Sequence, residues 1–107
     1  MHAAIRTALG LVLLALLLSS SPARAGNALA AKYGCLGCHA SATRLVGPAY
    51  QDVAARYADD RQAVERIVAS IRNGGSGRWG DMAMPPQPQV READAKKIAA
   101  WILAGAK

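Results

Sequence analysis

Apolar residues recur at helical spacing in four stretches of the chain, which segments rich in glycine and proline separate. We expect helices over 28–34, 49–57, 61–72 and 92–104. In the third stretch the apolar positions follow i, i+3, i+4 and i+7, the period of a helix buried on one face; they are Val64, Ile67, Val68 and Ile71. No alternating stretch is long enough to predict a strand. The pattern therefore predicts a small all-α fold.

Polar and special residues mark the ends of these helices. Asn27, and later Asp59 or Asp60, are candidate N-caps, because their side chains can accept a hydrogen bond from an unpaired backbone N–H. The glycine-rich segment 73–77 ends the third helix. A loop is expected over 78–91, because prolines exclude regular structure there; they are Pro85, Pro86 and Pro88. The inward face of the last helix is expected to hold Ala95, Ile98, Trp101 and Ile102.

The N-terminal segment has the pattern of a secretory signal peptide. Arg6 precedes an uncharged apolar run over 8–18, and Ala23-Arg24-Ala25 forms a cleavage site of small residues. The run is too short for a transmembrane helix, which needs about 20 residues. We therefore expect a cleaved signal peptide over 1–25 and one mature domain over 26–107, exported to the periplasm and without a membrane span. An uncleaved anchor is the alternative.

Composition leaves the mature domain with a weak hydrophobic core. The chain has 107 residues, enough for one domain, and contains no phenylalanine. Domains of this size usually need a disulfide, a metal or another bound group for stability. A disulfide between Cys35 and Cys38 would close a loop too short to restrict the unfolded chain much. We therefore expect a bound group to complete the core.

The segment Cys35-Leu36-Gly37-Cys38-His39 has the spacing at which c-type haem is attached. Two thiols on one turn can meet the two vinyl groups on one haem edge, and the adjacent imidazole can serve as the proximal iron ligand. A thioredoxin-like redox motif would need an α/β frame, which the pattern does not predict. A structural zinc site needs four ligands, and only these three are at hand besides carboxylates. The segment predicts one haem c, bound covalently through Cys35 and Cys38.

A low-spin electron carrier needs a second axial ligand. His39 is the only histidine of the mature domain, so ligation by two histidines within a monomer is excluded, and methionine or lysine remains. Met82 and Met84 lie two apart, so alternation along an extended segment does not separate them. The two prolines that follow restrict Met84 to an extended conformation and stiffen the loop, which favours Met84. Core packing is the alternative role for either methionine.

These residues resemble those of the class I c-type cytochromes, and most closely the small bacterial monohaem cytochromes of the c-551 type. The resemblance covers nearly all of the mature domain, in the pieces 34–40, 46–50, 71–74, 77–80, 84–86 and 101–103. It implies about four helices wrapped around one covalently attached haem.

The resemblance also implies roles for individual residues. Met84, in the Met-Pro-Pro triplet, would be the distal ligand, which leaves Met82 as packing. The carbonyl of Pro48 would accept the Nδ1–H of His39 and so fix its orientation. Trp79 would donate its indole N–H to a haem propionate.

Two positions near the end of the chain complete the resemblance. Trp101 would pack the last helix across the first. Where the family often has an Asn whose amide bonds the ligand sulfur, this chain has Gln87, which has a longer side chain.

The predicted function is that of a periplasmic one-electron carrier whose iron cycles between Fe(II) and Fe(III). It is not expected to be an enzyme, because both axial positions are filled. The alternative is a haem sensor or a gas- or peroxide-binding domain that has lost its Met ligand. The resemblance implies redox partner proteins, with a quinol–cytochrome complex as donor and a nitrite reductase or terminal oxidase as acceptor. A monomer is expected.

The basic residues give the chain a formal net charge of +6, but they are spread out without a Lys/Arg run, so nucleic-acid binding is not expected. A docking rim or contacts to the haem propionates are expected for Arg44, Arg72 and Arg78. Solvated helix faces are expected for Arg56, Arg61 and Arg66.

Overall fold

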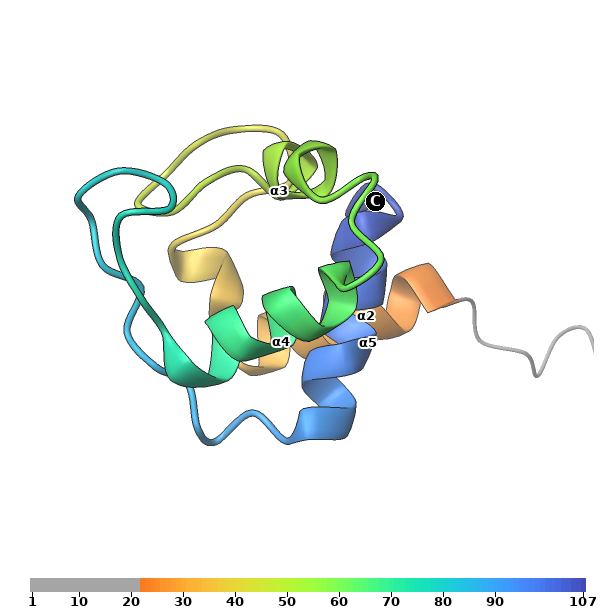
Figure 1. The fold of residues 1–107 in the computed structure, drawn as a ribbon. Coiled ribbons are helices and arrows are strands. Elements are labelled where there is room, and N and C mark those ends of the chain that lie inside the picture. The colour runs from red at the N-terminus through yellow and green to blue at the C-terminus, as the bar shows by residue number, and fades with distance from the viewer. Residues whose placement is uncertain (1–21) are drawn as a thin grey trace, which may run out of the picture.

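Four α-helices and one short 3-10 helix make up the fold, which contains no strand within residues 22–107 (Figure 1). The computed structural model describes residues 22–107, so the apolar run of the expected signal peptide lies outside the described part. The elements are α2 (Pro22–Lys32), η1 (Cys35–Gly37), α3 (Tyr50–Arg56), α4 (Ala63–Asn73) and α5 (Glu92–Leu103). None of these helices is long and apolar enough to cross a membrane. The all-α fold expected from the sequence is confirmed.

The bounds of the first helix differ from the prediction. α2 begins at Pro22, six residues earlier than expected, because proline suits the first helical position, where its missing N–H needs no partner. The helix ends at Lys32, and Gly34 follows in the left-handed region, with φ 74°. The expected cleavage site at 23–25 consequently lies inside α2. The helices α3 and α5 lie within one residue of their predicted bounds.

The helix α4 begins at Ala63, two residues later than predicted, and its N-cap, Gln62, makes no side-chain cap hydrogen bond. The predicted cap at Asp59 or Asp60 was therefore wrong. The carboxylate of Asp60 instead accepts a hydrogen bond from the backbone N–H of Gln62 at 2.8 Å, in the turn before the helix.

The last helix, α5, is the one on which the others pack. It contacts α2, α3 and α4, and no other pair of α-helices within residues 22–107 comes into close backbone contact. Figure 1 shows α5 crossing α2, with α4 alongside. The predicted inward face is buried, at 0–5% exposure; it consists of Ala95, Ile98, Trp101 and Ile102.

The helices α2 and α5 cross where Gly26 meets Trp101. A Cβ added at Gly26 would lie 2.1 Å from the Cβ of Trp101, so only glycine allows this approach. The ring of Trp101 also meets Tyr50 of α3 edge-on, with 5.4 Å between ring centroids, and its indole donates to the carbonyl of Lys107 at 3.1 Å. The predicted packing of the last helix across the first is confirmed.

A buried carboxylate ties the turn after α2 to the first turn of α5. The hydroxyl of Tyr33 donates to Oδ2 of Asp94 at 2.5 Å, and Nη2 of Arg91 lies 3.4 Å from the same oxygen. The hydrogen bond from Tyr33 lowers the pKa of Asp94; burial opposes this shift, and the charge of Arg91 adds to it. Because Tyr33 lies two residues before Cys35, this contact anchors the start of the cysteine segment to α5.

The lowered pKa makes this anchor sensitive to acid. A carboxylate whose pKa is lowered by folding stabilises the fold above its unfolded-state pKa of about 3.9, and that contribution disappears as the pH falls through the folded-state value. We expect the haem-loaded wild type to melt at a higher temperature than Asp94→Asn at neutral pH. The difference should shrink between about pH 5 and about pH 2. Circular dichroism melts across that range check this, and a difference that stays constant with pH would contradict it.

Candidate functional site

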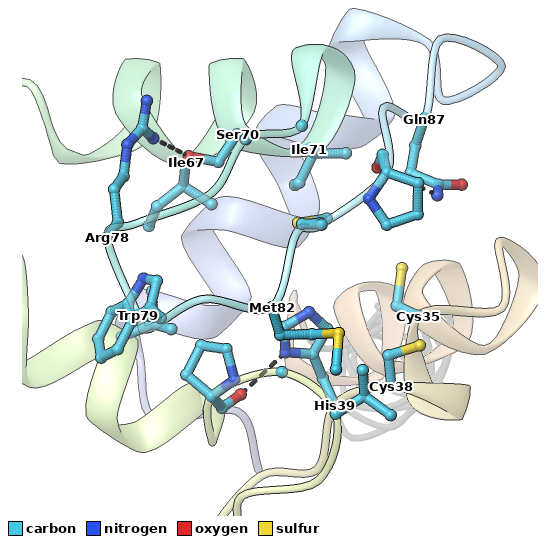
Figure 2. Close-up of a pocket in the computed structure, with 18 of the residues that line it drawn as sticks. Cys35, Cys38, His39, Ile67, Ser70, Ile71, Arg78, Trp79, Met82 and Gln87 are labelled. Atoms are coloured by element: carbon cyan, nitrogen blue, oxygen red, sulfur yellow. Dashed lines mark hydrogen bonds between the residues drawn. The ribbon is translucent and has the colours of Figure 1, made fainter.

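One pocket, between α3, α4, α5 and the loops, contains all six residues predicted for the site (Figure 2). They are Cys35, Cys38, His39, Pro48, Trp79 and Met84. Much of the remaining wall is apolar and comes from three helices; it includes Val53, Ile67, Ile71, Ile98 and Ile102. The six predicted residues, which lie between Cys35 and Met84 in the sequence, thus meet at one cavity.

Both cysteines are free thiols on the short turn of η1 and the residue after it. Figure 2 shows the two sulfurs on the same side of this turn. Burial raises the pKa of the Cys35 thiol, although a hydrogen bond with Tyr50 partly offsets the shift. Reactive cysteines usually have a lowered pKa, which is the opposite of the shift at Cys35. Within residues 22–107 no three or more His, Cys, Asp or Glu side chains are grouped as they would be around a metal ion.

The imidazole of His39 is fixed on three sides. Its Nδ1 lies 2.8 Å from the carbonyl oxygen of Pro48. Because a carbonyl can only accept, Nδ1 carries the proton and Nε2 keeps its lone pair for a metal. The ring stacks on Tyr50, with 4.9 Å between centroids and 14° between planes. On the remaining side lies Gly47, where an added Cβ would come within 2.3 Å of the His39 Cε1.

The backbone of Met84 is held by the glycines that end α4. Its N–H donates to the Gly75 carbonyl at 2.8 Å, and the Gly75 N–H donates back to the Met84 carbonyl at 3.0 Å. Gly74 has φ 67°, and a Cβ there would lie 2.4 Å from the Met84 oxygen. The N–H of Gln87 donates to the Ile71 carbonyl at 2.9 Å, which fixes the other side of the loop. The sequence predicted only that this glycine segment ends a helix; its contact with Met84 was missed.

The two methionines of this loop differ in burial. Met82 is 65% exposed, whereas Met84 is partly buried and packs against the core. Both line the pocket. The amide of Gln87 has partners within the loop, because it donates to the Pro85 carbonyl at 3.4 Å and accepts from Gln89 at 2.6 Å.

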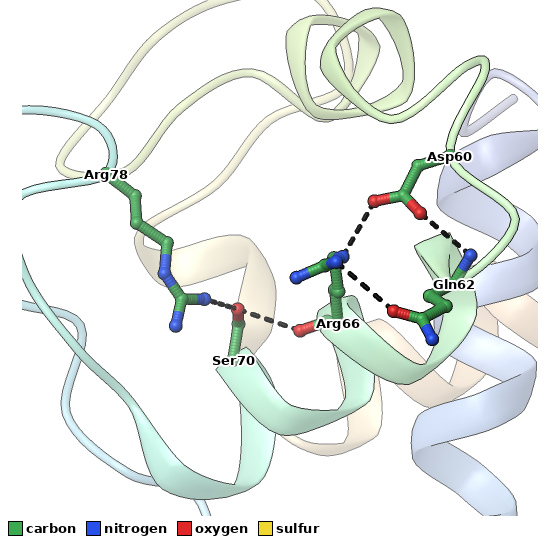
Figure 3. A network of polar contacts seen from close by, with 5 residues as sticks. All are labelled: Asp60, Gln62, Arg66, Ser70 and Arg78. Atoms are coloured by element: carbon green, nitrogen blue, oxygen red, sulfur yellow. Dashed lines mark hydrogen bonds and ion pairs between the residues drawn. The ribbon is translucent and has the colours of Figure 1, made fainter.

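Trp79 lies at the edge of the pocket among three arginines. The guanidinium carbon of Arg56 is 3.7 Å from the centroid of the Trp79 ring, and its Nη1 donates to the Arg78 carbonyl. Arg44 donates to the Trp79 carbonyl at 2.8 Å, and Arg78 donates to the hydroxyl of Ser70 at 2.6 Å (Figure 3). Arg56 is exposed, as expected, but the sequence did not predict its contacts with the 77–80 loop, which folds back against α3.

Arg72 differs from the sequence-based expectation. It does not line the pocket, and its Nε donates to the Val90 carbonyl at 3.2 Å. Arg66 is exposed, as expected, and its Nε also pairs with the Asp60 carboxylate at 2.7 Å (Figure 3). The basic edge of the pocket therefore consists of Arg44 and Arg78.

The pocket fits a haem c in both chemistry and lining. It brings together two thiols suited to thioether bonds, an imidazole with a free Nε2, and a thioether on a fixed loop. Its walls are mainly apolar, as a porphyrin requires. The arginines at its edge suit the carboxylates of the propionates.

Comparison of the sequence with known proteins points in one direction. Residues 23–106 match the profile of the family described as Cytochrome c. The chain is 46% identical over 87 residues to cytochrome c-552 of Nitrosomonas europaea, a match that covers 81% of this chain and 84% of that protein. It is 49% identical over 75 residues to cytochrome c-551 of Allochromatium vinosum, which covers 70% of this chain and 80% of that protein.

The structural similarities point to the same family as the sequence similarities. The crystal structure of wild-type Nitrosomonas europaea cytochrome c552 aligns with a TM-score of 0.71 at 47% identity, over 72% of this chain and 95% of that chain. The class 1 cytochrome MtoD from Sideroxydans lithotrophicus ES-1 shares the fold at a TM-score of 0.64 and 19% identity. With two thiols, an imidazole and a thioether around one apolar pocket, the chain belongs to the cytochrome c family, as a small class I monohaem cytochrome that carries covalently bound haem c.

Proposed function

We propose that this cytochrome is an exported one-electron carrier and not itself an enzyme. Bound haem supplies the one-electron chemistry, its iron cycling between Fe(II) and Fe(III). The observation that carries the proposal is that two suitable axial donors, the His39 imidazole and the Met84 thioether, line the same pocket and are each held by backbone contacts. When both are coordinated, a substrate can reach the iron only by displacing Met84.

The residues of the pocket would share the work of holding the cofactor. Cys35 and Cys38 would form the two thioether bonds, and His39 would bind iron through Nε2. The Pro48 carbonyl keeps the proton on Nδ1 and makes the imidazole a stronger donor. Trp79, which lines the pocket edge beside two arginines, would donate its indole N–H to a propionate.

Met84 would be the distal ligand. A thioether is a weak ligand for iron, so the entropy lost in holding it matters. The two hydrogen bonds to Gly75 and the two following prolines restrict the loop before the ligand binds, which reduces that loss. The high exposure of Met82 supports Met84 over Met82.

We also propose that residues 1–25 are a cleaved signal peptide and that the domain 26–107 works in the periplasm. The basic start, the short apolar run and the small residues at 23–25 support this. The partner classes are a quinol–cytochrome complex as donor and a nitrite reductase or terminal oxidase as acceptor. The mass of the exported protein tests the cleavage, since a chain that still begins at Met1 would indicate an anchor.

The positioning of the His39 ring can be tested by filling the space next to it. In Gly47→Ala the added methyl group would lie 2.3 Å from Cε1, so the ring must shift and its bond to Pro48 must weaken. We expect a displaced His39 Nδ1–H resonance in the reduced haem-loaded protein and a loss of about 1–3 kcal/mol of stability, as overpacking usually causes. Ala42→Val, which adds bulk at an exposed position of the same loop, is the control. An unchanged His39 resonance in Gly47→Ala would contradict this role.

The distal ligand can be tested by paired methionine variants. Met84→Ala should abolish the weak sulfur-to-iron charge-transfer band of the oxidised protein and allow the reduced protein to bind carbon monoxide. Met82→Ala should leave the band in place and the site closed. The reverse pattern would refute the assignment. Immediate binding of carbon monoxide by the wild type would favour the alternative function, a gas- or peroxide-binding domain.

A further inference from the structure

Three exposed arginines around Trp79 form no ion pair with a carboxylate of residues 22–107. We call Arg44, Arg56 and Arg78 the arginine face. Their hydrogen-bond acceptors are two backbone carbonyls and the hydroxyl of Ser70. None of the three takes part in the ion pairs Arg66–Asp60, Arg91–Asp94 and Lys96–Glu92.

These contacts fix the guanidinium groups and leave donors free. Each arginine has five N–H donors, and the contacts above occupy one donor of each. Arg56 is held further by its stacking on the Trp79 ring. A carboxylate would therefore meet donors that are already in position, and little side-chain entropy would be lost on binding.

Through Arg56 the arginine face extends beyond the haem pocket. Arg44 and Arg78 line that pocket and can serve the propionates, but Arg56 does not line it. Instead, Arg56 lines a separate hollow on the outer surface together with Arg78, and the other walls are Tyr57, Asp60, Arg66 and Ala69. Figure 3 shows Arg78 and the Arg66–Asp60 pair, which belong to these walls. Because Asp60 neutralises Arg66, the hollow keeps the charge of Arg56 and Arg78.

The arginine face also lies close to the cofactor site. Trp79 lines the haem pocket, and its ring carries the guanidinium of Arg56. A protein seated on Arg56 is thus separated from the pocket by one indole. Val46 and Met82, which are 51% and 65% exposed, add apolar surface at the pocket mouth. A small apolar centre beside fixed charges suits a complex that must form and dissociate quickly.

We propose that the arginine face is the docking surface for an acidic redox partner protein, with a partner carboxylate bound between Arg56 and Arg78. The proposal rests on the proposed electron-carrier function and specifies the kind of partner that this function uses. The charge of the face would mainly raise the rate of encounter, and salt would screen it over about 10 Å at 0.1 M ionic strength.

Poly-L-glutamate can stand in for the acidic partner. In the reduced haem-loaded protein at low salt, we expect it to shift the NMR signals of the Trp79 indole and of the Arg56 and Arg78 side chains. Arg56→Gln should weaken this binding about threefold or more, as expected for the loss of one close charge. Lys97→Gln, which removes the same charge from an exposed position of α5, is the matched control and should have a smaller effect. Arg56→Lys keeps the charge and should retain most of the binding.

Reversible oxidation and reduction by small mediators, measured on the same samples, tests the carrier function separately. If redox cycling is intact but the shifts fall elsewhere, or Arg56→Gln and Lys97→Gln weaken binding equally, the docking proposal is overturned and the carrier function stands. The proposal also fails if Arg56→Gln changes only the pH dependence of the reduction potential, since its charge would then act on the propionates.

Discussion

The rest of the structure depends on the packing of three helices, α2, α3 and α4, onto the last helix, α5. Because α2, α3 and α4 make close backbone contact with α5 but not with one another, the side of the fold away from α5 is not closed by helix packing. Many of the buried side chains are only alanines, at positions 30, 49, 63, 95, 99 and 106. Val53, Ile67 and Ile102 line the pocket, and their side chains are too small to fill it. A large apolar cofactor bound in this pocket supplies the missing core, so the functional site is also part of what stabilises the fold.

The donor atoms come from cysteine, histidine and methionine, but their positions depend on residues without functional side chains. Gly47 leaves the space in which the His39 ring lies, and the Pro48 carbonyl fixes its tautomer. Gly75 exchanges two hydrogen bonds with Met84. Each of the two donor residues is thus held by backbone contacts close to it in space. Such contacts restrict both residues, which suits the proposed carrier function, in which the two oxidation states must keep the same geometry.

The sequence predicted those parts of the fold that depend on local pattern. The apolar period of α4 and α5, the glycine-rich end of α4 and the thiol–imidazole segment were recognisable because neighbouring residues determine them. The predicted start of α2 was wrong, because the helix begins at Pro22 and continues through Gly26, although glycine is a poor helix former and this stretch also has the pattern of a signal peptide. The roles of Gly47, Gly74 and Arg56 could not be predicted, because each depends on a neighbour distant in sequence or on a loop that folds back. The role of a glycine can be recognised only when the group that lies where a side chain would otherwise be is known.

The most direct test of the central claim, that bound haem completes the core, is the folding of the chain without it. The double variant Cys35→Ala/Cys38→Ala, purified free of haem, can be measured by far-ultraviolet circular dichroism alongside the haem-loaded wild type. If the cofactor completes the core, the variant gives little helical signal and no cooperative thermal transition. A haem-free variant that is helical and melts cooperatively would contradict the claim, because the helices would then be sufficient to stabilise the fold.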